Sequence, residues 1–297
     1  METRPVEDQV SFDSDGLRIV GVLHRPDKPA RSGRHAAILL LHGFGSNKEA
    51  EWVKLTAGLL AGWGYATLRF DFRGCGESEG ERARVICLEQ VQDTKNAVGF
   101  LAARPDIAPS RIAVFGHSFG AAVAVYAGGT DNRIAAVISS GGWGDGEKKF
   151  RRQHATPEAW QRFTDMMAEG KRTRAQTGQS IKVPRYDIVP IPPHLRSNLA
   201  PGSHLEFPFE VVESMYAFRA NDVVGNIAPR PLLLLHPAND SVTPTEQSID
   251  LFQHAQQPAD LHLIANVDHF LLSEGNPLVI NVVRNWLQRY FPAAPDE

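Results

Sequence analysis

Gly116-His117-Ser118-Phe119-Gly120 has the pattern G-x-S-x-G. The apolar run before it, 112–115, is typical of a buried strand, and the alanine- and valine-rich run after it, 119–127, is typical of a buried helix. A serine between two such elements must make a tight turn, and the flanking glycines remove the Cβ atoms that would clash there. We therefore predict that Ser118 projects from the end of a strand and acts as a nucleophile. The alternative is a glycine-rich turn whose serine only caps the helix.

The elements on both sides of this turn alternate between strand and helix. Residues 9–12 and 17–23, separated by Ser14-Asp15-Gly16, predict a hairpin. Strands that alternate with helices form a mostly parallel sheet covered on both faces, so the sequence predicts an α/β fold. The predicted strands are 36–41, 66–70, 111–115, 135–139, 231–236 and 261–264, and the predicted helices are 49–61, 88–101, 119–127, 245–255 and 278–290.

The alternation stops between residues 141 and 226. Six of the 20 prolines fall between Pro184 and Pro208, and three of the four methionines lie in the same stretch. We interpret it as an insertion at the carboxyl edge of the sheet, where open α/β folds bind ligands. The length of 297 residues alone would suggest two domains. The pattern predicts instead one core, residues 1–140 and 227–297, with a cap of residues 141–226.

The composition argues against several classes of protein. Lys and Arg total 31 against 34 Asp and Glu, and this near-balance is unlike the basic excess of nucleic-acid binders. No apolar run approaches the roughly 18 residues that cross a bilayer, and residues 1–16 lack the apolar segment of a secretory signal, so we expect a cytoplasmic protein without membrane segments. Cys75 and Cys87 are too few for a disulfide scaffold or a cysteine zinc site. Scattered histidines predict no metal site, and neither a P-loop nor a dinucleotide fingerprint is present, so no cofactor is implied.

Around Ser118 the chain resembles the α/β-hydrolase-fold serine hydrolases, over nearly its whole length apart from the insertion. Leu41-His42-Gly43-Phe44-Gly45 resembles the family's oxyanion loop, and Asp71-Phe72-Arg73-Gly74-Cys75-Gly76-Glu77-Ser78 resembles its D-x-R-G-x-G-x-S segment. Within the family, the chain is most similar to the feruloyl/cinnamoyl-type esterases and related acyl hydrolases. The resemblance implies a mostly parallel eight-stranded sheet flanked by helices, with a cap. It also implies a hydrolase that cleaves a carboxylic ester through an acyl-enzyme.

A serine hydroxyl is a poor nucleophile unless a base takes its proton and a carboxylate orients that base. The family's chain order is Ser, then the acid, then His, and it points to Asp240 and His269. Asp240 lies in Pro237-Ala238-Asn239-Asp240-Ser241-Val242-Thr243-Pro244, where a proline replaces the glycine that is usual in the family's acid loop. His269 lies in Asn266-Val267-Asp268-His269-Phe270, which resembles the family's base loop. A capping role for Asp240, a surface role for His269 and a rival acid at Asp145 are the alternatives.

The remaining residues of the expected site also follow from the resemblance. It implies that the backbone N–H groups of Phe44 and Phe119 form the oxyanion hole. We expect His42 to brace its loop and Asp268 to have a structural role. His117, beside the nucleophile, is expected to be structural or to line the pocket.

The insertion supplies the other candidate substrate-binding residues, Trp143, Trp160 and Met167. The alternative is that these apolar side chains form the core of the cap itself. Residues 147–185 contain ten Lys/Arg and four Asp/Glu. A cap with this charge would attract an anionic substrate, although a solvated helical face has the same composition.

The predicted partner is a small-molecule acyl substrate. An amidase, a peptidase, a thioesterase or a C–C bond hydrolase would use the same triad, and a non-catalytic ligand receptor on this fold is the alternative from another class. The resemblance also makes a homodimer a candidate, because similar hydrolases pair through the last helix or the cap.

Overall fold

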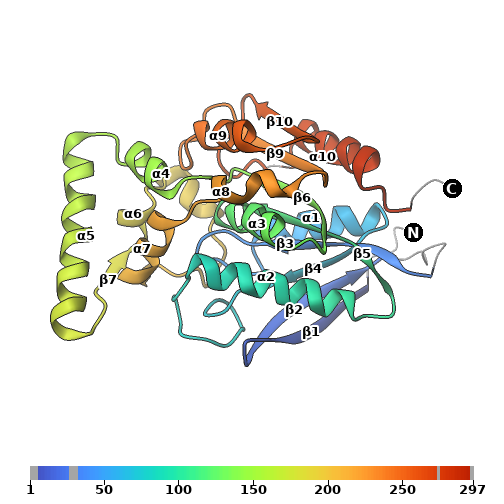
Figure 1. Ribbon diagram of the computed structural model, residues 1–297, viewed down its shortest axis with the longest axis horizontal. Helices are drawn as coiled ribbons and strands as arrows, with labels where there is room; N and C mark the ends of the chain where they lie inside the picture. The colour runs from blue at the N-terminus through green and yellow to red at the C-terminus, as the bar shows by residue number, and fades with distance from the viewer. Residues whose placement is uncertain (1–5, 27–32, 273–274, 295–297) are drawn as a thin grey trace.

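An eight-stranded sheet runs through the centre of the computed structural model (Figure 1), which describes residues 6–26, 33–272 and 275–294. The first residues of the segment expected to lack a secretory signal lie outside this description. The strand order is β1-β2-β4-β3-β5-β6-β9-β10, with β1 and β2 antiparallel and the strands from β4 onward parallel. The mostly parallel sheet is therefore confirmed. Its strands are β1 (Val6–Ser14), β2 (Leu17–Arg25), β3 (His35–Leu41), β4 (Ala66–Phe70), β5 (Ile107–His117), β6 (Ile134–Ser140), β9 (Leu232–Pro237) and β10 (Ala259–Ile264).

Helices cover both faces of the sheet. Successive side chains of a strand point to opposite faces, so β3 contributes to two separate cores. Ile38 and Leu40 belong to the core beneath α1 (Glu51–Gly62) and α10 (Pro277–Tyr290). Leu39 belongs to the core beneath the helices of the other face, α2 (Cys87–Ala102) and α3 (Phe119–Thr130). A strand buried on both faces explains why its sequence lacks alternation. The helix α9 (Glu246–His254) packs beside β9 and β10.

Residues 141–226 connect β6 and β9, which are neighbours in the sheet. We call residues 141–226 the intervening segment, and its division from the core as a separate cap remains a prediction. Figure 1 shows α5 at the far left, beyond α4, α6 and α7. The strands β7 and β8 form a two-stranded antiparallel sheet. The elements are α4 (Gly146–Gln153), α5 (Pro157–Thr177), β7 (Lys182–Pro184), α6 (Arg185–Ile188), the 3-10 helix Pro193–Asn198, β8 (Glu206–Pro208), α7 (Phe209–Ala217) and α8 (Asn221–Val224), and the 3-10 helix Gly225–Ile227 leads on to β9.

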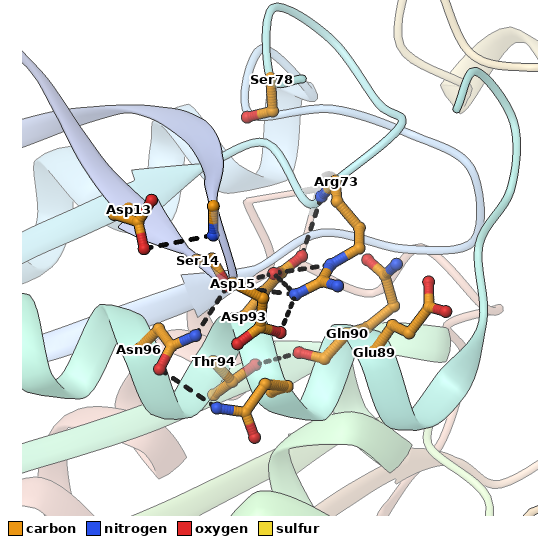
Figure 2. A network of polar contacts seen from close by, with 12 residues as sticks. Asp13, Ser14, Asp15, Arg73, Ser78, Glu89, Gln90, Asp93, Thr94 and Asn96 are labelled. Atoms are coloured by element: carbon orange, nitrogen blue, oxygen red, sulfur yellow. Dashed lines mark hydrogen bonds and ion pairs between the residues drawn. The ribbon is translucent and has the colours of Figure 1, made fainter. Parts of the chain in front are cut away.

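The loop after β4 is fixed to the rest of the core by a buried polar network (Figure 2). The Arg73 guanidinium donates to Asp93 Oδ1 of α2 at 2.7 Å and to Asp15 Oδ2 at 2.8 Å. Ser14 Oγ donates to the same Asp93 oxygen at 2.6 Å and accepts from Asn96 Nδ2 at 2.8 Å. Asp93 is completely buried, so these hydrogen bonds replace the ones that its carboxylate would make with water. The network ties the 71–78 segment to α2 and to the β1–β2 turn.

No helix among the described residues is both long enough and apolar enough to cross a membrane.

Candidate active site

Ser118 lies in the sharp turn between β5 and α3. Its φ of +56° is in the left-handed region, and its N–H donates to the Ser140 carbonyl at 2.8 Å. A Cβ on Gly116 would lie 2.0 Å from the Gly120 carbonyl oxygen, and a Cβ on Gly120 would lie 2.2 Å from the Leu41 carbonyl oxygen. Both positions therefore require glycine, as the motif predicts, because the turn brings backbone against backbone. The turn leaves Ser118 half-buried at the first turn of α3.

The structure brings His269 and Asp240 to Ser118. His269 Nε2 lies 2.9 Å from Ser118 Oγ, and His269 Nδ1 lies 2.8 Å from Asp240 Oδ2. An ionised carboxylate only accepts, so Nδ1 carries the proton and donates to Asp240, which leaves Nε2 to accept from the serine hydroxyl. The two carboxyl-side loops that follow β9 and β10 supply Asp240 and His269. Three residues far apart in the sequence thus form one chain of hydrogen bonds.

The environment of Asp240 keeps its carboxylate ionised. Burial alone would raise the pKa of Asp240, but the neighbouring imidazoles of His269 and His236 outweigh burial and hold the pKa well below its usual range. His236 Nε2 lies 3.3 Å from Asp240 Oδ2. The other oxygen, Oδ1, accepts from the Val242 and Thr243 N–H groups, each at 2.7 Å. These contacts fix the carboxylate in the orientation that faces His269.

Asp268 and Asp145, the two other carboxylates considered from the sequence, lie elsewhere. Asp268 Oδ1 accepts from the Ser241 N–H at 2.9 Å and from the His269 N–H at 2.7 Å, so it joins the loop of Asp240 to the loop of His269. Asp145 is the N-cap of α4, where it accepts from the Lys148 N–H at 3.0 Å. The carboxylate that contacts His269 Nδ1 is that of Asp240.

The two backbone amides expected to form the oxyanion hole belong to Phe119, which follows Ser118 directly, and to Phe44, whose neighbour Gly43 lies so near that a Cβ on it would be 3.8 Å from Ser118 Cβ. Phe119 is the first residue of α3, so its N–H has no partner inside the helix. Within the described residues, neither this N–H nor that of Phe44 is paired with an acceptor. His42 braces the Phe44 loop: its Nε2 accepts from the Phe72 N–H at 3.2 Å, and its Nδ1 lies 2.9 Å from the Gly43 carbonyl. Burial lowers the pKa of His42, which favours the neutral ring that this arrangement needs.

Ser118 and His269 open onto a small cavity of about 40 Å³, measured as the space available to the centre of a water molecule. Phe44, in the loop after β3, and Leu199 of the intervening segment line the same cavity. His117 also lines it, and its buried ring lies 5.0 Å from the ring of His269. A single water needs roughly 10–15 Å³ by this measure, so the cavity has room for only a few water-sized groups.

The other three predicted pocket residues do not line this cavity. Trp143 packs edge-on against Phe218 at 5.3 Å, and Trp160 stacks on Phe163 at 5.5 Å. Met167 belongs to the apolar core beneath α5. Trp143 and Met167 are buried and Trp160 is partly buried, so these side chains pack within the protein, which is the alternative to lining the pocket.

The positive charge of residues 147–185 is largely neutralised or exposed to solvent away from the cavity. Arg151 and Arg152 of α4 are exposed and pair with Glu147 and Glu246 at 3.3 Å and 3.2 Å. Among the basic residues of this stretch, Arg185 lines the cavity. The sequence does not single out Arg185, because it is one of ten cations in residues 147–185 and no motif distinguishes it. Among the described residues, no group of three or more His, Cys, Asp or Glu side chains is placed to hold a metal ion.

Comparison with known proteins identifies the class to which this sheet and the Ser118 turn belong. The model of the alpha/beta hydrolase family matches residues 38–280, and the chain belongs to that family. The resemblance inferred from the sequence is therefore confirmed at the level of the family and the fold.

The chain is similar to several proteins over different lengths. The quorum-quenching protein AidA of Acinetobacter baumannii is 32% identical over 138 residues, which are 46% of this chain and 44% of that protein. The polyketide transferase grgF of Penicillium is 26% identical over 282 residues, 90% of each chain. The thiohydrolase aneE of Aspergillus aculeatus is 27% identical over 88% of this chain and 86% of its own.

Solved structures share the fold at low sequence identity. The crystal structure of GrgF from Penicillium superposes with a TM-score of 0.77 at 22% identity and covers 96% of this chain and 99% of its own. The structure of Est1E from Butyrivibrio proteoclasticus with bound ferulic acid superposes with a TM-score of 0.66 at 18% identity, covering 95% of this chain and 98% of its own. At these identities the likeness concerns the fold alone.

Proposed function

We propose that this protein is a serine hydrolase that cleaves a small carboxylic ester through an acyl-enzyme intermediate. The observation that carries the proposal is the continuous hydrogen-bond chain from Ser118 Oγ through His269 to Asp240, with lengths of 2.9 Å and 2.8 Å. A nucleophile, a base and an orienting carboxylate in this order are the arrangement that activates a serine hydroxyl. Membership of the alpha/beta hydrolase family supports the same reaction class.

In the first half of the reaction, Ser118 Oγ attacks the ester carbonyl carbon and its proton passes to His269 Nε2. Asp240 stabilises the imidazolium that results, and the N–H groups of Phe44 and Phe119 donate to the oxyanion. The tetrahedral intermediate then collapses, the C–O bond to the alcohol breaks, and His269 returns its proton to the departing oxygen. Ser118 is left as an acyl ester.

In the second half, a water gives its proton to His269 Nε2 and attacks the acyl carbon. The bond to Ser118 Oγ breaks, the proton returns to that oxygen, and the carboxylic acid leaves. The sum is one ester and one water converted to an acid and an alcohol. No cofactor enters either step.

Thioester hydrolysis is the second candidate, favoured by the thiohydrolase relative, which aligns over most of both chains. A thiolate leaves from the tetrahedral intermediate with less protonation than an alkoxide needs, so the same triad serves both substrates. Amide and C–C bond cleavage use the same triad as well, but no contact in the site favours them.

Labelling of the nucleophile tests the mechanism. A fluorophosphonate should add its mass to Ser118 of the folded enzyme, and Ser118→Ala should lose labelling together with at least about 10⁴-fold in turnover. Ser110→Ala, which removes an exposed serine on β5, is the matched control and should keep both. Folded protein without labelling, or turnover that survives in Ser118→Ala, would overturn the proposal.

Matched substrates then distinguish the leaving groups. The substrates are an ester, a thioester and an amide with the same acyl chain. Their relative kcat/KM values identify the preferred bond. Binding of these compounds without turnover, unchanged in Ser118→Ala, would instead identify a ligand receptor.

A further inference from the structure

Arg185 begins α6 in the intervening segment and lies in the wall of the cavity that holds Ser118 and His269. Its side chain is almost completely buried, with 3% of the residue exposed. The guanidinium Nη1 donates to the His204 carbonyl at 2.6 Å, and Nη2 donates to the Phe44 carbonyl in the oxyanion loop. Arg185 thus connects the intervening segment to the Phe44 loop, beside the His204 N–H, which donates to the Gly45 carbonyl at 2.9 Å, and the Phe207 ring, which stacks on Phe44.

The Arg185 guanidinium has no carboxylate partner among the described residues. The rings of Phe44 and Phe207 lie 5.2 Å and 5.8 Å from it. Two carbonyl dipoles and two aromatic faces compensate part of the hydration that a buried cation loses, but they supply no opposite charge.

Part of the hydrogen-bonding capacity of Arg185 is also unused. A guanidinium has five N–H donors, and two of them are engaged by the carbonyls described above. The Nε atom is buried and has no hydrogen-bond partner within the described residues. Buried donors are normally paired, so an unpaired donor on a side chain that lines the cavity calls for an acceptor that arrives with the substrate.

We propose that Arg185 is a specificity-determining residue of this enzyme, and that it binds a carboxylate carried by the substrate within a few bonds of the scissile ester carbonyl. The proposal rests on the proposed hydrolase function and adds the substrate class to it. A carboxylate supplies both what the guanidinium lacks, the opposite charge, and the acceptors for its free N–H groups, and Arg binds such a group in a two-point geometry. The exposed arginines of α4 are already paired and lie outside the cavity wall, so they do not form this contact.

A role for Arg185 in holding the Phe44 loop makes a different prediction. If Arg185 only fixes that loop, its loss impairs the oxyanion hole and slows every ester equally. If it binds a carboxylate, its loss slows anionic esters more than neutral ones. The ratio of kcat/KM between two matched substrates therefore separates the two roles.

The experiment uses p-nitrophenyl half-esters of succinate, glutarate and adipate beside neutral p-nitrophenyl esters of the same chain lengths. A second pair carries the carboxylate on the alcohol side, as acyl esters of a short hydroxy acid and of the corresponding neutral alcohol. The wild type is compared with Arg185→Met, Arg185→Lys and Arg172→Met. Arg172→Met removes the same charge from an exposed position on α5 and is the matched control.

We expect the wild type to prefer at least one anionic ester over its neutral partner in kcat/KM. Arg185→Met should lower that preference by about 10- to 100-fold, the effect of losing a charge-assisted hydrogen bond in a buried site. Arg185→Lys should recover part of it, and Arg172→Met should leave it unchanged. A wild type without any anionic preference, or an equal loss on both substrates in Arg185→Met, would overturn the proposal.

Two further readouts keep the test independent of folding and of the triad. Fluorophosphonate labelling of Ser118 in Arg185→Met reports whether the variant keeps a reactive site, and failure of labelling in the wild type would refute the hydrolase function itself rather than the role of Arg185. In the wild type, glutarate should slow the labelling of Ser118 while the isosteric neutral diamide should not. Equal protection by both compounds, or by neither, would contradict binding of a carboxylate.

Discussion

Lys149→Met should stabilise this protein by several kcal/mol at neutral pH. Lys149 lies on α4 with 2% of the residue exposed, and its Nζ atom has no hydrogen-bond partner among the described residues. The Nζ atom lies 4.0 Å from the centre of the Phe150 ring and 5.3 Å from that of Trp143. Burial lowers the pKa of Lys149 from 10.5 to about 7, because these surroundings disfavour the ammonium form.

The magnitude follows from the linkage between protonation and folding. The folded-state pKa is lower than the unfolded one, so between pH 7 and 10.5 the unfolded chain holds a proton that the folded chain releases. The free energy of unfolding therefore rises with pH across this window, by up to about 1.4 kcal/mol per pH unit from this group. The cost of burying Lys149 is about 4 kcal/mol at pH 7 and falls to about 1 kcal/mol at pH 10. Methionine, unbranched and of similar length, removes the charge and keeps the packing.

Urea unfolding of the wild type and Lys149→Met at several pH values between 6.5 and 10 measures this effect. Other groups titrate in the same range, so the informative quantity is the difference between the two proteins. We expect that difference to be largest near pH 7 and to shrink by about 3 kcal/mol toward pH 10. A stability difference between the two proteins that does not change with pH would refute the reasoning. It would mean that Lys149 keeps its proton when the chain folds.

Three further substitutions test the site and the core around it. Asp240→Asn should lower kcat by about 10³- to 10⁴-fold with the fold intact, measured by ester turnover and circular dichroism, because an amide does not hold the imidazole in the same tautomer. Gly120→Ala should destabilise by several kcal/mol in urea unfolding, since its Cβ would meet a β3 carbonyl at 2.2 Å, whereas Gly58→Ala, with open space at its Cβ in α1, should be neutral or slightly stabilising. Asp93→Ala should cost about 3–5 kcal/mol because it leaves Arg73 without its buried counter-charge.

Each of these predictions has a contradicting result. Turnover in Asp240→Asn within tenfold of the wild type would remove that carboxylate from the proposed mechanism. Equal stabilities of the two glycine variants would show that the turn relaxes around a Cβ. A loss below about 1 kcal/mol on removing the buried carboxylate would mean that water replaces it.

The parts of the fold that the sequence predicts are those whose pattern depends on local geometry. Residues 36–41 form a strand buried on both faces, so their apolar run is continuous and easily recognised. The turn at Ser118 needs glycine on both sides for steric reasons, so the residues of the motif are enough to predict the shape of the turn. The positions of Asp240 and His269 came from the chain order of a resembling family, and the hydrogen-bond lengths come from the structure.

The parts that the sequence does not predict depend on what lies opposite a side chain. The spacing of Trp160 and Met167 indicates that one face of a helix is buried, but not whether that face meets a substrate or another helix. Lys149 and Arg185 are charged residue types that are usually exposed, so a count of charges places them on the surface. Both are buried by the packing of the intervening segment. Neither the adjacent residues nor a hydrophobic periodicity in the sequence indicates that burial.

The proposed reaction and the proposed substrate selectivity depend on different parts of this chain. Ser118 is held at a positive φ that costs on the order of 1–3 kcal/mol, and the sheet supports it through the Ser140 carbonyl and through glycines that let β3 and α3 approach. That support belongs to the folded core, so the nucleophile and His269 are aligned before any substrate enters. Arg185 comes from the intervening segment and reaches the same cavity by binding the Phe44 carbonyl. Under the proposed function we therefore expect a change in that segment to alter which substrate is accepted without disturbing the Ser118–His269–Asp240 hydrogen bonds, provided that the bond to the Phe44 carbonyl is kept.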